Sequence, residues 1–240
     1  PRLVTEQVQE AYDWCAHLDG ELYSAQMAAQ SLLIGLDDLG TQAETRFQKM
    51  DFRFLYDSHR QVFHIGYNVE SGALDGNYYD LLASEARITS LLAIGKGDIP
   101  QSHWLHLSRP VTRVNGTRVL LSWGGTMFEY LMPSLLLHDY EGTLLAETAR
   151  GAVDHQITYG RQNGVPWGIS ESGYYRFDAG MHYQYRGFGV PGLGFKRDLG
   201  EDLVIAPYAS LLAMSVRPQA VMQNIDRLIQ ERMLGRYGFY

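Results

Sequence analysis

The segment from which the fold of this chain is inferred is Tyr78-Tyr79-Asp80-Leu81-Leu82-Ala83-Ser84-Glu85-Ala86-Arg87-Ile88-Thr89-Ser90-Leu91-Leu92-Ala93-Ile94. Its apolar residues recur at helical spacing, so it predicts a helix over residues 78–94. One face of that helix carries, at steps of four, three and four, Leu81, Glu85, Ile88 and Leu92. The segment therefore predicts a mainly helical fold with an acidic residue inside an apolar stripe.

Glu85 is the first candidate for chemistry. A carboxylate in apolar surroundings is costly unless it is paired or used, and desolvation favours its neutral form. Such a group is a candidate acid, base or nucleophile. The structural alternative is a buried glutamate paired with Arg87 or Arg60. The segment alone leaves both readings open.

Composition excludes several classes of protein. The 240 residues are 45% hydrophobic and 20% charged, which suits one domain of ordinary size or part of a larger one. A net charge of −7 with scattered basic residues predicts that nucleic acid is not a partner. No apolar run approaches the roughly 18 residues of a membrane span. The single Cys15 excludes an internal disulfide.

The remaining elements follow from local patterns. Residues 5–36 predict two helices, the second running from about Asp19 to Leu36 and ending at the polar residues 37–40. A short amphipathic piece over 41–50, a strand over 62–68 and a loop over 71–77 follow. Asn115-Gly116 between two β-like runs, 111–114 and 117–121, predicts a tight hairpin. Further helices are expected at 126–138, at 143–159 and after Pro207 and Pro218, with a long aromatic loop over 160–200.

Glu171 is the second candidate. Pro166, Gly168 and Gly173 prevent a regular helix around it, so it is expected on a loop among aromatic residues. Aromatic rings stack on the apolar faces of sugars while acids bind hydroxyls, so this neighbourhood is typical of a sugar-binding cleft. The alternative is a solvated loop glutamate.

For three further acidic residues, a structural role explains the sequence as well as a functional role does. Thr126-Met127-Phe128-Glu129 has the spacing of a capping box, in which Glu129 bonds the backbone at the helix start. Asp75 and Asp80, near the start of the Glu85 segment, are explained equally well as caps or turn residues.

Other motifs fail on their context. Residues 187–192 match a dinucleotide fingerprint by letter, but no strand precedes them and Pro191 interrupts them. His103 and His106 lack the glutamate and third ligand of a metal site. Ser170 and Ser172 do not form the elbow of serine hydrolases. Two carboxylates among aromatic residues remain, and they indicate glycosidic-bond chemistry.

Six blocks of sequence, in order along the chain, resemble the glycoamylase-like region of cyclic β-1,2-glucan synthases. They are DFRFLYD (51–57), YDLLASEAR (79–87), GTMFEYLMP (125–133), PWGISES (166–172), FGVPGLG (188–194) and DLVIAPY (202–208). The likeness covers residues 51–240. Residues 1–50 resemble the helical segment that precedes this region in those synthases.

The resemblance implies an (α/α)6 barrel, with part of the barrel expected beyond Tyr240. It implies a middle domain of a multidomain inner-membrane protein, facing the cytosol. A glycosyltransferase domain would extend a linear β-1,2-glucan, this region would close it into a ring by transglycosylation, and a phosphorylase-like domain would follow. No metal or organic cofactor is expected.

Carried over by motif, the expected catalytic pair is Glu85 and Glu171. The first assignment makes Glu171 the general acid/base and Glu85 the nucleophile or stabiliser. Expected substrate-binding residues are Glu129, Asp75, Asp80, Trp123, Trp167, Tyr174, Tyr175, Tyr183 and Tyr185.

Two rival functions stay open at this point. An endo-β-1,2-glucanase would keep the fold and the substrate, and a non-catalytic glucan-binding domain would keep only the binding. A carboxyl separation of about 5 Å suits a retaining double displacement, and a wider gap suits an inverting hydrolase.

Overall fold

The computed structural model describes residues 2–240, except for the side chains of residues 2–4 and 174–176. The chain divides into two compact units, one ending at Asp51 and the other running from Phe52 to Tyr240. Helices account for most of the ordered structure, and every sheet is small. Among the described helices, none combines the length and apolar character that a bilayer crossing requires.

The first unit is a single helix, α1 (Arg2–Lys49). The prediction of two helices and a separate short piece was wrong, because no residue between 5 and 49 is a strong enough breaker. A glycine such as Gly40 costs a helix only about 1 kcal/mol relative to alanine, and proline is absent from this stretch. Gln42 Nε2 also donates to Asp38 Oδ2 at 2.8 Å, which spans the expected break.

In the second unit, the segment 78–94 is only partly helical. Tyr78–Tyr79 forms strand β5, and helix α2 begins later, at Arg87, and ends at Lys96. Tertiary pairing explains the difference: β5 pairs with β2 (Val62–His64), which also pairs with β1 (Tyr56–Asp57). The backbone of Asp80 and Leu82 then hydrogen-bonds to Ser108 at 2.6 and 3.0 Å. The apolar stripe predicted around Glu85 therefore does not form.

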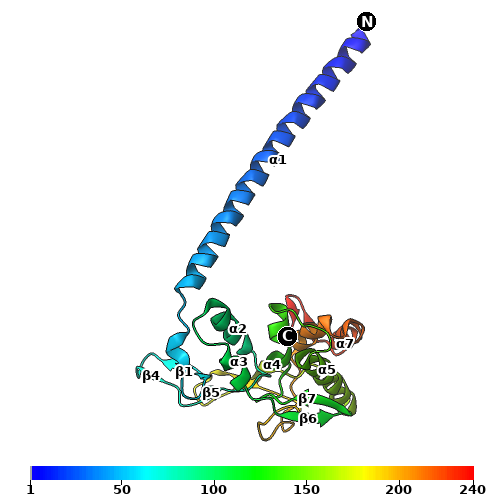
Figure 1. The fold of residues 1–240 in the computed structure, drawn as a ribbon. Coiled ribbons are helices and arrows are strands. Elements are labelled where there is room, and N and C mark those ends of the chain that lie inside the picture. The colour runs from blue at the N-terminus through cyan, green and yellow to red at the C-terminus, as the bar shows by residue number, and fades with distance from the viewer. Residues whose placement is uncertain (1) are drawn as a thin grey trace. The chain divides into compact units, whose positions relative to one another are not determined.

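Local turn chemistry is confirmed at the hairpins. Strands β6 (Val111–Val114) and β7 (Thr117–Leu120) pair around Asn115 and Gly116, which have φ values of 48° and 81°. Positive φ at both turn residues matches the twist of the flanking strands. The hairpin lies along helix α5 (Leu144–Gln162), where the missing side chain of Gly151 leaves space for Val119 (Figure 1).

The expected strand over 62–68 is present as β2 and β3 (Tyr67–Asn68), the latter paired with β4 (Ala73–Leu74). The helix expected at 126–138 is shorter and has two pieces, α4 (Met127–Leu131) and the 3₁₀ turn η2 (Met132–Leu135). The remaining short elements are η1 (Arg53–Leu55), α3 (Ser102–His106), η3 (Ala213–Ser215), β10 (Leu234–Gly235) and β11 (Gly238–Phe239). Helices α6 (Pro207–Leu212) and α7 (Pro218–Gln230) each begin at a proline, as predicted.

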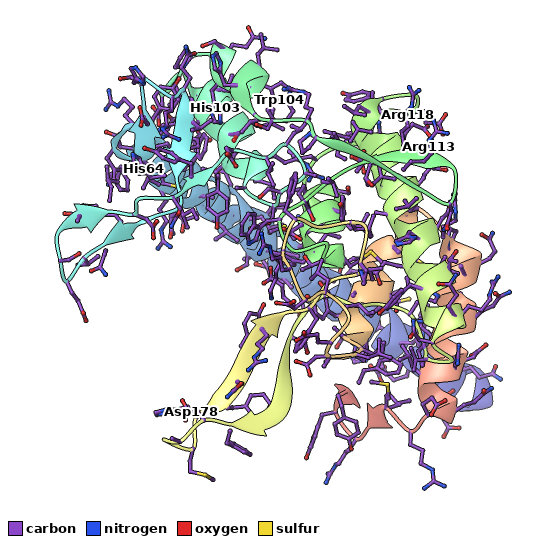
Figure 2. The ribbon with its side chains drawn as sticks, turned by 90° about the horizontal axis from the view of Figure 1, so that it is seen from below. His64, His103, Trp104, Arg113, Arg118 and Asp178 are labelled. Carbon is purple, nitrogen blue, oxygen red and sulfur yellow. The ribbon has the colours of Figure 1, made fainter. Side chains whose placement is uncertain are left out.

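The long stretch 160–200 contains regular structure that the sequence reading missed. Strands β8 (Glu171–Phe177) and β9 (Tyr183–Gly187) form a hairpin that extends away from the helices of the second unit, with Asp178 near its tip (Figure 2). Glu171 therefore lies at the first residue of a strand and not in a loop. The alternation of aromatic and polar residues in β9, Tyr183-Gln184-Tyr185-Arg186, was the available signal for the hairpin.

The core of the second unit forms where α4, α5, α6 and β7 meet. Its fully buried side chains include Val119, Leu120, Met127, Leu131, Val153, Val190 and Leu193. Val190 and Leu193 come from the rejected dinucleotide motif and the segment after it. That stretch packs so closely on Gly124 and Gly125 that only glycine fits at Gly189 and Gly194.

Candidate active site

A cleft of about 700 Å³ opens in the second unit. Three glutamates from three separate segments reach it: Glu85, Glu129 and Glu171. Its other lining residues are Arg60, Ile65, Gly76, Asn77, Tyr78, Tyr79, Asp80, Leu81, Ser84 and Trp123. The cleft thus gathers carboxylates, aromatic rings and one guanidinium.

Glu85 lies in the irregular segment between β5 and α2. Its Oε2 accepts a hydrogen bond from Ser84 Oγ at 3.2 Å. Burial raises the pKa of Glu85 above its usual value, and the negative charges of Glu129 and Glu171 raise it further. The site therefore favours the protonated form of this carboxyl.

Arg87 holds that segment in place. Its guanidinium is buried and donates to the carbonyl oxygens of Ser84, Glu129 and Tyr130 at 2.9 to 3.1 Å. Burial lowers the pKa of Arg87 to about 10. Within the part of the chain that the structure describes, no ion pair joins Glu85 to a basic side chain. The other expected partner, Arg60, lies 4.6 Å from the ring centre of Tyr78.

Glu171 is held from two directions. Tyr185, on the opposite strand, donates its hydroxyl to Glu171 Oε2 at 2.7 Å. Tyr208, on α6, donates to the carbonyl oxygen of Glu171 at 2.8 Å and lies 3.0 Å from Ser170 Oγ. Although the residue is largely exposed, partial desolvation of its hydroxyl and the bond to Glu171 raise the pKa of Tyr185. A phenol that stays protonated beside a carboxyl oxygen stabilises the ionised carboxylate.

Glu129 has the capping-box geometry that the sequence predicts. Its carboxylate accepts hydrogen bonds from Ser122 Oγ, Gly124 N and Thr126 N at 2.8 to 2.9 Å. Glu129 therefore has both predicted roles: it lines the cleft, and its oxygens cap helix α4 by binding the backbone before it. This carboxylate carries charge to the cleft but has little freedom to move.

The aromatic residues predicted to bind substrate lie in different parts of the structure, and only some of them line the cleft. Trp123 lines the cleft and is 66% exposed, so its face is open to a ligand. Trp167 is buried in the core, where its backbone binds the Asn224 side chain. Tyr183 and Tyr185 are exposed on β9, outside the cleft lining. The side chains of Tyr174 and Tyr175 lie outside the described part of the structure.

Of the two aspartates predicted to bind substrate, only one lies in the cleft. Asp80 lines the cleft. Asp75 lies outside the lining, and its Oδ1 accepts from the backbone and side-chain amides of Asn77 at 2.7 and 3.0 Å. The turn interpretation of Asp75 is therefore the one that the geometry favours.

Sequence reasoning missed two residues that complete the site. Tyr79 lines the cleft, and burial together with the charges of Glu85 and Glu171 raises its pKa. Its place in the conspicuous segment around Glu85 was a usable signal. Tyr208 reaches Glu171 from a helix far along the chain, and no local pattern announces it.

The cleft brings together two carboxyl groups in different environments. The pKa of one carboxyl is raised by burial and by neighbouring charge, and a second carboxylate accepts a phenolic hydrogen bond. Two carboxyl groups in contrasting environments are the requirement for glycosidic-bond cleavage.

The family model Glycoamylase matches residues 77–240. The chain belongs to the glycoamylase family. It is 49% identical over 191 residues to the cyclic beta-(1,2)-glucan synthase NdvB of Rhizobium meliloti (strain 1021), which confirms the likeness inferred from the six blocks. That alignment covers 80% of this chain and 7% of NdvB.

Solved structures of glycoamylase-like folds are also similar. An endo-beta-1,2-glucanase from Chitinophaga pinensis, in complex with sophorotriose and glucose, matches with a TM-score of 0.60 at 18% identity. A glucoamylase-like protein from Bacteroides caccae ATCC 43185 matches with a TM-score of 0.62 at 16% identity. Each match covers 85% of this chain and 52% of the other, and at these identities the likeness concerns the fold alone.

Proposed function

We propose that this chain is the transglycosylase region of a cyclic β-1,2-glucan synthase, with Glu85 and Glu171 as its catalytic pair. The observation that carries the proposal is that these two glutamates, distant in sequence, line the same cleft. The 49% identity to a cyclic β-1,2-glucan synthase supports the substrate class.

We assign the two roles in the opposite sense to the sequence-based expectation. Glu85 is the general acid/base, because burial and two neighbouring carboxylates favour its protonated form. Glu171 is the nucleophile, because the Tyr185 hydroxyl stabilises its ionised form. The sequence predicts this pair of carboxyls, whereas their separate environments come from residues remote along the chain.

The reaction runs as a double displacement. The Glu171 carboxylate attacks the anomeric carbon, the glycosidic C–O bond breaks, and Glu85 gives its proton to the leaving sugar oxygen. A hydroxyl at the far end of the same glucan then attacks the glycosyl–Glu171 ester, and Glu85 takes the proton of that hydroxyl. The glycosyl–Glu171 bond breaks, both carboxyl groups return to their starting states, and the β configuration is kept.

The remaining parts of the proposal concern context. The substrate is linear β-1,2-glucan, and the helices of the second unit form part of an (α/α)6 barrel. The partners are the glycosyltransferase and phosphorylase-like domains of one synthase, at the cytoplasmic side of the inner membrane. The short share of NdvB that this chain spans is consistent with a multidomain parent.

An endo-β-1,2-glucanase is the second candidate. The fold shared with the Chitinophaga pinensis endo-beta-1,2-glucanase favours it. The same cleft would then pass the glycosyl group to water in place of a sugar hydroxyl. Exclusion of water from the cleft therefore decides between the two outcomes.

The test incubates the protein with linear β-1,2-glucan and follows the products by mass. Transfer yields a non-reducing ring, one water lighter than a linear chain of the same number of glucose units, together with the released leaving fragment, whereas hydrolysis yields reducing chains and no ring. Glu85→Gln and Glu171→Gln should each abolish the reaction, while Glu70→Gln, at an exposed glutamate away from the cleft, should leave it intact. If both cleft variants keep full activity, the catalytic pair is lost; if the parent protein itself yields neither product, the domain only binds glucan.

A further inference from the structure

The β8–β9 hairpin carries both Glu171 and the tyrosine that contacts it, Tyr185. Its two strands place Glu171 opposite Gly187 and Gly173 opposite Tyr185. Side chains of paired residues share a face of a hairpin, so the Tyr185 ring and the Glu171 carboxylate lie on the same face. A Cβ at Gly187 would meet only the Glu171 side chain, at 3.9 Å, whereas a Cβ at Gly173 would lie 2.6 Å from the Tyr183 ring, so the missing side chain of Gly173 makes room for Tyr183.

The two side chains make a direct hydrogen bond. Tyr185 Oη lies 2.7 Å from Glu171 Oε2, within the usual range for a hydroxyl donor. Tyr185 is 66% exposed and lies outside the cleft lining. An exposed hydrogen bond adds little to the free energy of folding, so global stability does not explain the contact well.

The backbone of Glu171 is fixed separately. Tyr208 donates to its carbonyl oxygen, and Ser170 Oγ accepts from the backbone N–H of Phe128 at 3.0 Å. These bonds tie the first residue of β8 to α6 and α4. With the backbone held, the remaining freedom of Glu171 is the rotation of its side chain, and the Tyr185 hydroxyl restricts that rotation.

We propose that Tyr185 is a positioning residue whose hydrogen bond keeps the Glu171 carboxylate aimed into the cleft. This rests on the proposed function, in which Glu171 is the nucleophile. Tyr185 then acts through Glu171 and not as a stacking surface for sugar, which is the role expected for it from the sequence. A misplacement of a reacting group by about 1 Å can reduce a rate about 100-fold.

The test compares Tyr185→Phe, Tyr185→Ala and a matched control, Tyr140→Phe, whose ring is 67% exposed and lies away from the cleft. In Tyr185→Phe the value of kcat should fall roughly 10- to 100-fold while KM stays unchanged. The acidic limb of the kcat/KM profile should move to higher pH, because the ionised carboxylate has lost a donor. Tyr140→Phe should keep the parent profile, and thermal unfolding of all three variants should match the parent.

A purely stacking role predicts a different result. The phenylalanine variant would then keep the parent pH profile, and only Tyr185→Ala would raise KM; that result would overturn the positioning role. Glu171→Gln separates the two proposals, because an active Glu171→Gln variant sinks the proposed function itself. A readout that needs no turnover is the titration of Tyr185 by NMR of labelled tyrosine: Glu171→Gln should lower the pKa of this phenol, and an unchanged value would contradict the contact.

Discussion

The carboxylate of Glu129 accepts a hydrogen bond from the backbone N–H of Gly124 at 2.8 Å, from within the first turn of α4. Two more donors, Ser122 Oγ and Thr126 N, complete its shell. The loop that these bonds fix is the one that presents Trp123 to the cleft. A single buried acid thus couples a helix start to the exposed aromatic face at the site.

Replacing Glu129 by alanine should therefore lower the free energy of unfolding by about 3 kcal/mol, because three buried donors lose a charged acceptor. Chemical denaturation measures the change. The control is Glu147→Ala, since Glu147 is half exposed and its partner Arg150 lies at the surface, where an ion pair contributes under about 1 kcal/mol. Equal losses of unfolding free energy in the two variants would show that the three hydrogen bonds to the Glu129 carboxylate contribute no more than a surface ion pair.

A second prediction concerns the glycines beneath that loop. A Cβ at Gly189 would overlap the carbonyl oxygen and carbon of Gly124, so Gly189→Ala must displace the Trp123 loop. We expect a loss of about 3 kcal/mol or more and a parallel loss of glucan binding. Gly66→Ala is the matched control, because nothing lies within 4 Å of its Cβ position. Thermal unfolding and glucan titration should separate the variants, and a stable, binding-competent Gly189→Ala protein would refute the close packing.

Arg87 gives a third prediction. Its guanidinium serves three carbonyl oxygens that have little access to water, among them those of Glu129 and Tyr130. Arg87→Leu leaves these acceptors unpaired and should reduce the free energy of unfolding by about 3 kcal/mol. Arg113→Leu, on the exposed strand β6, should change it by less than about 0.5 kcal/mol. A similar denaturation midpoint for both variants would contradict the structural role of Arg87.

Elements with local signals could be predicted, and elements set by distant partners could not. The Asn115-Gly116 hairpin, the Thr126 cap and the proline starts of α6 and α7 each depend on residues adjacent in sequence. The segment at Tyr78 has helical spacing, yet it forms strand β5 because it pairs with Phe63 and His64 of β2. Pairing energy from remote backbone outweighs a propensity of a few tenths of a kcal/mol per residue.

The same division applies to the site. Glu85 and Glu171 could be proposed as candidates from their neighbours and from the family resemblance, and both line the cleft. Their electrostatic environments could not, because they arise from Glu129 and from the hydroxyl of Tyr185 across a strand pair. The prediction that Trp167 binds substrate was wrong. It rested on a position close to Glu171 in the sequence, but the residue is buried in the core.

The raised pKa of Glu85 gives a prediction for stability against pH. Its ordinary value is 4.5, and burial followed by the charges of Glu129 and Glu171 raises it in the folded protein. The folded state therefore binds this proton more tightly than the unfolded state, so the stability that Glu85 contributes is complete below about pH 4.5 and is lost as pH rises through the folded pKa. Glu85→Gln is neutral at every pH and escapes that loss.

We accordingly expect Glu85→Gln to have a higher Tm than the parent at pH 7, with a difference that shrinks on acidification and vanishes near the unfolded pKa. Thermal unfolding from pH 4 to 8 measures it, with Glu70→Gln as the exposed control. The variant should be stabilised and inactive together, as expected when an active site holds a costly group for function. A Tm difference that does not vary with pH would show that ionisation of Glu85 is not the source, and the assignment of Glu85 as the proton donor would lose its physical basis.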